Sequence, residues 1–158
     1  GYPEHREERK IIAETRFHDI HTLIEAVSPV LRPEDLKDGY QVIQEKVKVH
    51  EAIIGYVDNI LKATRDPRKS GILKGSPNDP ENWLKAGAST RGGIKLIAAA
   101  KTVAALKGRN VVTPEDVQEI MKEVLAHRIF VQPSAETRRS RVVHEFLDEI
   151  KKVIEVPL

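Results

Sequence analysis

The sequence of 158 residues contains no cysteine, which excludes a disulfide framework and any zinc site that uses thiolate ligands. A chain without cysteine is most typical of a cytoplasmic protein, and we expect that location. No apolar run approaches the roughly 20 residues that a membrane-spanning helix requires. A secretory signal is also not expected, because the charged stretch at residues 4–10 is not followed by a long apolar segment.

Neither charge nor aromatic content favours nucleic acid as a ligand. The chain carries 26 basic and 24 acidic residues, a net charge of only +2, and its aromatic content is 4%. Binding to nucleic acid requires a concentrated basic face, and binding to single strands adds aromatic side chains on which bases stack. The two local basic clusters, residues 65–69 and 138–141, are interpreted as solvated loops.

Several catalytic patterns are missing. There is no Gly-x-x-x-x-Gly-Lys-Ser/Thr loop to cradle phosphates, no apolar strand ending in an acidic pair, and no Gly-x-Ser-x-Gly elbow. His18 and His21 share a helical spacing, but no further ligands follow at a suitable distance, so we predict no metal site. The chain by itself is therefore expected to be catalytically inactive.

The apolar residues that are present recur at intervals of three and four, which predicts helices. The predicted helices cover residues 4–15, 33–47, 49–64, 90–107 and 113–128, with a last one that includes residues 143–154. Residues 17–31 keep this spacing only in part and stay ambiguous. The sequence therefore predicts an all-α fold, a bundle of about five or six helices forming one domain over residues 1–158.

One segment interrupts the helical pattern. Residues 66–88 are rich in proline, glycine and small polar residues and are predicted to form a loop. A loop of this length is unusual in a compact domain. We interpret it as a disordered linker, with a partner-specific insertion as the alternative.

The segment that joins this loop to the helix at residues 90–107 is a candidate binding site. Ser89 is placed to cap the helix, and Arg91 then lies in its first turn beside free backbone N–H groups. An arginine there opposes the helix dipole, and a residue placed against the local electrostatic preference suggests a function. The alternative is an ordinary solvated arginine.

At this point the sequence resembles a known family. Gly87-Ala88-Ser89-Thr90-Arg91 is similar to the Gly-Ala-Ser-Pro-Arg motif of MoxR AAA+ ATPases. Further matches to the family occur in the same order along the chain, on both sides of this motif. They include Gly1-Tyr2-Pro3-Glu4, Val112-Thr113-Pro114-Glu115-Asp116-Val117 and Leu125-Ala126-His127-Arg128-Ile129. Each motif alone is generic, but the ordered set is specific and covers essentially the whole chain.

The resemblance implies that the chain is the helical lid domain of such an ATPase, without the ATP-binding core. The lid would close over ATP and Mg²⁺ held by that core, with Arg91 as the sensor-two arginine that acts only together with the core. Nucleotide binding would involve Gly87, Ala88, Ser89 and Thr90 as well. The family also implies a ring oligomer, commonly a hexamer, which assembles or matures partner proteins in a chaperone-like way, often with von Willebrand A-domain proteins.

Three features depart from the family pattern. Thr90 stands where the family usually has proline, Arg32 stands where a Ser or Thr cap is common, and the loop containing Trp83 is longer than usual. Two alternatives to a MoxR lid stay open. One is a free-standing helical protein-interaction module, and the other is a related lid such as that of magnesium-chelatase ATPase subunits.

Overall fold

The computed structural model describes residues 2–14, 20–72 and 79–157. It comprises two compact units, Gly1–Asp38 and Gly39–Leu158. The described residues form seven α-helices and one small sheet of two strands, which confirms the predicted all-α class. The helix count exceeds the expected five or six because a short helix forms within residues 17–31, where the sequence pattern is ambiguous.

The first unit contains α1 (His5–Ala13), α2 (Ile20–Glu25) and the beginning of α3 (Pro33–Lys46). Pro33 opens α3 as predicted. The Arg32 backbone N–H donates to Asp35 Oδ2 at 2.9 Å, and the Arg32 guanidinium pairs with the same carboxylate. Arg32 thus replaces the usual Ser or Thr cap without loss of the helix start, because the Asp35 carboxylate takes up the N-terminal donor. The predicted relation of His21 to His18 lies outside the described residues, since His18 is not among them.

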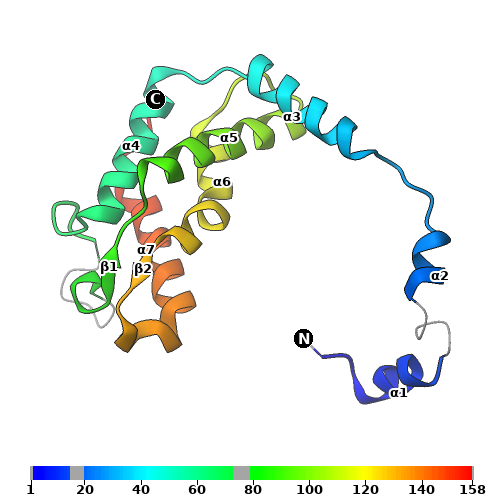
Figure 1. The fold of residues 1–158 in the computed structure, drawn as a ribbon. Coiled ribbons are helices and arrows are strands. Elements are labelled where there is room, and N and C mark those ends of the chain that lie inside the picture. The colour runs from blue at the N-terminus through cyan, green and yellow to red at the C-terminus, as the bar shows by residue number, and fades with distance from the viewer. Residues whose placement is uncertain (1, 15–19, 73–78, 158) are drawn as a thin grey trace. The chain divides into compact units, whose positions relative to one another are not determined.

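Four helices build the second unit: α4 (Glu51–Arg65), α5 (Thr90–Leu106), α6 (Pro114–Leu125) and α7 (Arg139–Val153). Helix α5 packs against both α4 and α6, and α7 closes the other side of the core against the same two helices (Figure 1). Small residues of α5, Ala100 and Ala104, are fully buried and allow the neighbouring helices to approach closely. The largest fully buried side chains of this core include those of Ile60, Leu96, Met121, Leu125, Phe146 and Leu147.

The predicted loop at residues 66–88 is regular in its described second half. It contains a short 3-10 helix (Pro80–Asn82) and strand β1 (Leu84–Ala86), which pairs antiparallel with β2 (Phe130–Val131). Trp83 is completely buried, and its ring meets the Phe146 ring edge-on with centroids 5.4 Å apart. The interpretation of this part as a disordered linker is therefore wrong, because Trp83 anchors it in the core. Residues 73–78 lie outside the described part.

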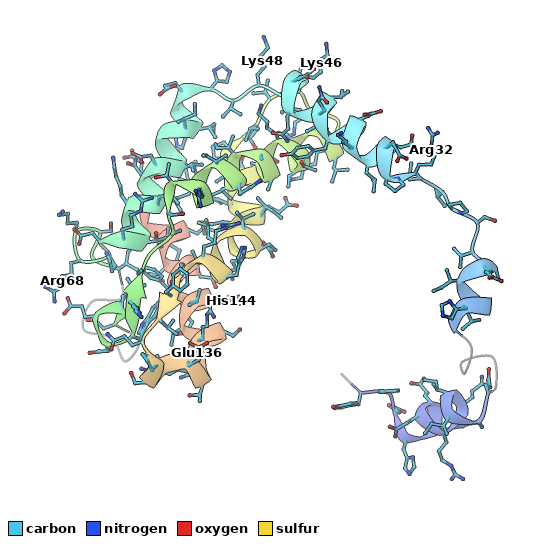
Figure 2. All side chains as sticks on the ribbon, viewed as in Figure 1. Arg32, Lys46, Lys48, Arg68, Glu136 and His144 are labelled. Atoms are coloured by element: carbon cyan, nitrogen blue, oxygen red, sulfur yellow. The ribbon has the colours of Figure 1, made fainter. Side chains whose placement is uncertain are left out.

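Two further 3-10 helices, Ala126–Arg128 and Pro133–Arg138, flank β2 and lead into α7. Arg68, labelled in Figure 2, pairs with Glu81 and so connects the described parts of the predicted loop. The Arg68 side chain is 70% exposed and that of Glu81 is 40% exposed, so this ion pair contributes little to stability. The burial of Trp83 is the stronger constraint on the segment.

The turn between α5 and α6 is fixed by backbone bonds. Gly108 adopts a φ of 71°, which ends α5 in the predicted left-handed conformation. Beyond it, the Lys48 N–H donates to Asn110 O at 2.8 Å, and the Val112 N–H donates to Lys48 O at 3.0 Å. This parallel bridge joins the connection between α3 and α4 to the turn between α5 and α6.

Asp116, in the first turn of α6, is a completely buried carboxylate. It accepts hydrogen bonds from the Arg109 guanidinium at 2.5 and 2.8 Å, from Lys107 Nζ at 3.2 Å and from the Thr113 N–H at 2.9 Å. Thr113 and Asp116 form a capping box, in which the Thr113 side chain accepts the backbone N–H of Asp116, as predicted. The Thr113 hydroxyl also lies 3.2 Å from Asp116 Oδ2, to which it can donate. Burial raises the pKa of Asp116, but these hydrogen bonds outweigh burial and lower the pKa to about 2.

We predict that Asp116→Asn lowers the free energy of unfolding by about 2–4 kcal/mol at neutral pH, because it leaves two cations without their buried partner. The folded-state pKa lies below the ordinary 3.8, so the carboxylate stabilises the fold above pH 4 and this contribution is lost as pH falls toward 2. Denaturant unfolding of both proteins between pH 2 and 7 measures the difference.

The matched control is Asp148→Asn, which removes a carboxylate that is about half exposed and pairs with Lys122 at 2.7 Å. We expect it to cost less than about 1 kcal/mol. Equal losses in the two variants, or a wild-type acid transition unchanged in Asp116→Asn, would contradict the role given to the buried cluster.

Candidate functional site

The segment Gly87–Arg91 crosses the C-terminal end of α4 and is bonded to it. The buried Thr64 hydroxyl donates to Leu61 O at 2.7 Å and accepts the Ala88 N–H at 3.0 Å. Arg65 Nε donates to Ala88 O at 2.7 Å. Both polar backbone groups of Ala88 are therefore satisfied by α4, and the chain enters α5 from a fixed position.

Gly87 permits this close approach. A Cβ atom at Gly87 would overlap the carbonyl group of Thr64 and lie 2.7 Å from the backbone nitrogen of Arg65. In the first turn of α5, a Cβ at Gly93 would lie 2.7 Å from Leu61 Cδ1. Gly87 and Gly93 are thus explained by packing against α4, which the sequence pattern alone did not reveal.

Helix α5 begins at Thr90 with its first donors unsatisfied. Ser89 takes the predicted N-cap position in extended conformation, but its hydroxyl makes no capping hydrogen bond. Within the described residues, the backbone N–H groups of Thr90 and Arg91 have no acceptor, and the first turn carries no acidic side chain. The positive end of the helix dipole is therefore uncompensated, which favours an anion at this place.

Arg91 is exposed, whereas Ala88 and Gly92 on either side of it are buried. Its guanidinium makes no hydrogen bond or ion pair with any other residue in the described ranges. The predicted residues 87–91 thus form one segment, whose backbone is fixed to α4 at Ala88 and whose Arg91 guanidinium has no partner in the described residues. Its chemistry is that of an anion-binding element with a guanidinium fork.

The sequence assigned no site role to Arg128, whose side chain lies against Gly92, the residue that follows this segment. A Cβ on Gly92 would lie 3.4 Å from Arg128 Cδ, so the arginine side chain passes over the first turn of α5. The sequence placed Arg128 only at the C-terminal end of a helix, because its contact depends on how α5 and α6 pack.

No group of three or more His, Cys, Asp or Glu side chains in the described residues is placed to hold a metal ion. Among the same residues, no helix is both long and apolar enough to cross a membrane.

Comparison with known proteins places this geometry in a family. A sequence model of the AAA lid domain matches residues 81–150, a range that includes Gly87–Arg91. The MoxR protein of Paracoccus denitrificans is 35% identical over 158 residues, which cover 98% of this chain and 46% of that protein. The chain belongs to the MoxR family of AAA+ ATPases. The MoxR protein of Methylorubrum extorquens is 34% identical over 96% of this chain and 44% of its own length.

One further relative agrees with this assignment, and one solved structure shares the fold. The chaperone MoxR1 of Mycobacterium tuberculosis is 35% identical over 82% of this chain and 31% of that protein. A crystal structure of a proposed ATPase from Cytophaga hutchinsonii has the same fold, with a TM-score of 0.74 at 23% identity, over 100% of this chain and 45% of that one. This MoxR chain thus spans less than half the length of the relatives it matches.

We predict that Gly87→Ala destabilises the second unit by about 1–3 kcal/mol, because the added methyl group meets the backbone of Thr64 and Arg65. The Ala88 N–H should also lose protection from hydrogen exchange as its bond to Thr64 is strained. Denaturant unfolding and amide exchange of the purified chain measure both effects.

Gly55→Ala is the matched control, because a Cβ at Gly55 meets nothing within 4 Å and the residue lies inside α4. It should stabilise the chain by about 0.5–1 kcal/mol through helix propensity. A Gly87→Ala variant as stable as wild type would show that the close approach to α4 is not required.

Proposed function

We propose that this MoxR chain closes over ATP and Mg²⁺ held by an ATP-binding core of the same protein, with Arg91 as the sensor-two arginine. The observation that carries the proposal is the contrast at Gly87–Arg91. The backbone is bonded to α4 through both polar groups of Ala88, while the Arg91 guanidinium is exposed and has no partner in the described residues. A cation held in this way is preorganised for a ligand that another part of the protein delivers.

The residues of the segment fit a phosphate group. The N–H groups of Thr90 and Arg91 have no acceptor in the part of the chain that the structure describes, and Ser89 adds a hydroxyl that makes no capping bond. Gly87 and Ala88 serve as the fixed base of the segment. Phosphoryl transfer is catalysed mainly by positioning and by charge stabilisation, so Arg91 would act on the charge that develops at the terminal phosphate. Mg²⁺ is assigned to the core.

In this proposal residues 1–158 together form the lid domain. The full-length protein would be a cytoplasmic ATPase that forms a ring, a hexamer by family resemblance. Since one relative carries the name chaperone, we extend the proposal to chaperone-like assembly or maturation of partner proteins, with von Willebrand A-domain proteins as candidate partners. Lid movement on hydrolysis would supply the mechanical step.

The alternative is a free-standing helical protein-interaction module. In that case Arg91 would be an ordinary exposed arginine and nucleotide would have no effect on the protein. The effect of Arg91 on nucleotide binding therefore separates the two functions.

We predict that the isolated chain hydrolyses no ATP above background, because nothing in its sequence provides a phosphate-cradling loop or a magnesium site. Phosphate release from the purified chain with Mg²⁺ and ATP is the measurement. A turnover rate that persists through purification and disappears in Arg91→Ala would contradict the need for a core.

We predict that Arg91→Ala in the full-length protein lowers ATP turnover by about 100-fold or more, as expected for removal of a preorganised donor to the transition state. Affinity for ATP should fall about tenfold and affinity for ADP should not change, because only the terminal phosphate is contacted. Arg141→Ala, which removes an exposed arginine of α7, is the control and should behave as wild type. Unchanged turnover in Arg91→Ala would refute the sensor-two role.

A further inference from the structure

A second cationic feature lies next to Arg91. A surface hollow of about 430 Å³ lies between α5 and α6. The basic side chains in the lining of this hollow are Lys95, His127 and Arg128. Glu123 is the carboxylate in the same lining. Arg91 lies one helical turn before Lys95 on the same face of α5, so the hollow continues the candidate site along the helix.

Arg128 is the cation of this hollow that is held most firmly. Its Nε donates to Val124 O at 3.1 Å, which fixes the plane of the guanidinium relative to α6. Its stem passes within 3.4 Å of the place that a Cβ on Gly92 would occupy, so it also rests on the turn that carries Arg91. Its two terminal nitrogens make no hydrogen bond or ion pair with any other described residue.

Two cations near Arg128 form ion pairs with carboxylates, whereas Arg128 forms none with the described residues. Lys122, on α6, binds Asp148 at 2.7 Å, and Arg139, at the start of α7, contacts Glu136 and donates to Ile129 O. Arg128 instead shares the lining of the hollow with Lys95, and its stem lies against Gly92, the residue after Arg91. In the described lining Glu123 is the one carboxylate that offsets these cations, so an anion with several negative charges relieves the repulsion between them.

We propose that Arg128 binds the terminal phosphate of ATP together with Arg91. This inference rests on the proposed function of Arg91 and adds a residue to the same site. Two planar guanidinium groups on adjacent elements, each with donors available, match the geometry of a phosphate and its charge. The packing of Arg128 on the turn of Arg91 favours this shared ligand over an acidic surface of another subunit.

The test uses the full-length protein and fluorescent analogues of ATP and ADP. Arg128→Gln keeps the aliphatic carbons as far as Cδ and a polar NH2 donor, but it removes the charge. It should weaken ATP binding about tenfold and change ADP binding less than twofold, whereas Arg128→Lys retains part of the affinity. The double variant with Arg91→Gln should lose less affinity than the product of the single losses, because both residues contact one group.

Arg141→Gln is the matched control for loss of one arginine charge, and thermal unfolding shows that each variant is folded. If Arg91→Gln weakens ATP binding and Arg128→Gln does not, the Arg128 assignment is overturned while the lid function stands. If neither variant changes ATP binding, both are overturned. Equal losses of affinity for ATP and ADP in Arg128→Gln also overturn the Arg128 assignment. A defect in ring assembly at unchanged ATP affinity overturns it in favour of an acidic surface on a neighbouring subunit.

Discussion

The buried hydroxyl of Thr64 is the contact on which the start of α5 depends. It bonds simultaneously to its own helix and to the N–H of Ala88, so the end of α4 and the entry of α5 become one structural unit. The close approach that this bond requires explains Gly87, and the burial of Ala88 follows from it. The backbone N–H and C=O of Ala88 are hydrogen-bonded to α4, which fixes the chain where it enters α5. The N–H groups of the first turn of α5 can therefore stay available for a ligand, and Arg91 extends from a fixed backbone.

The two ends of α5 are fixed by different chemistry. At the N-terminal end the contacts are hydrogen bonds of Ala88 with the Thr64 hydroxyl and the Arg65 guanidinium, and the first turn of α5 carries no acid. At the C-terminal end, Lys107 and Arg109 bind the buried Asp116 of α6, so cations stand where the dipole favours them. The helix is thus electrostatically complete at one end and incomplete at the other. The ion pairs that stabilise α5 lie at the end of the helix away from Arg91. An acid beside Arg91 would compete with a phosphate ligand, and the first turn carries none.

Sequence patterns predicted the parts of the fold that depend on local chemistry. The turn at Gly108, the start of α6 at Pro114 and the amphipathic faces of α4, α5 and α7 all follow from residues close together in the chain. Trp83 and Arg128 could not be placed in this way. A single large apolar residue in a stretch rich in proline and polar residues gives no periodicity, and its burial depends on Phe146, more than 60 positions later. The contact of Arg128 with the first turn of α5 likewise depends on the packing of α6 against α5.

The parallel bridge at Lys48 has a mechanical consequence. Both backbone groups of this one residue are bonded to the turn between α5 and α6, so the chain is clamped there before α4 begins. A pull that reaches Lys48 along α3 is loaded onto that turn, at the end of α5 opposite to Arg91, and not onto the first turn of α4. Helix α5 then behaves as a rod that receives force at its C-terminal end and carries the guanidinium at its other end.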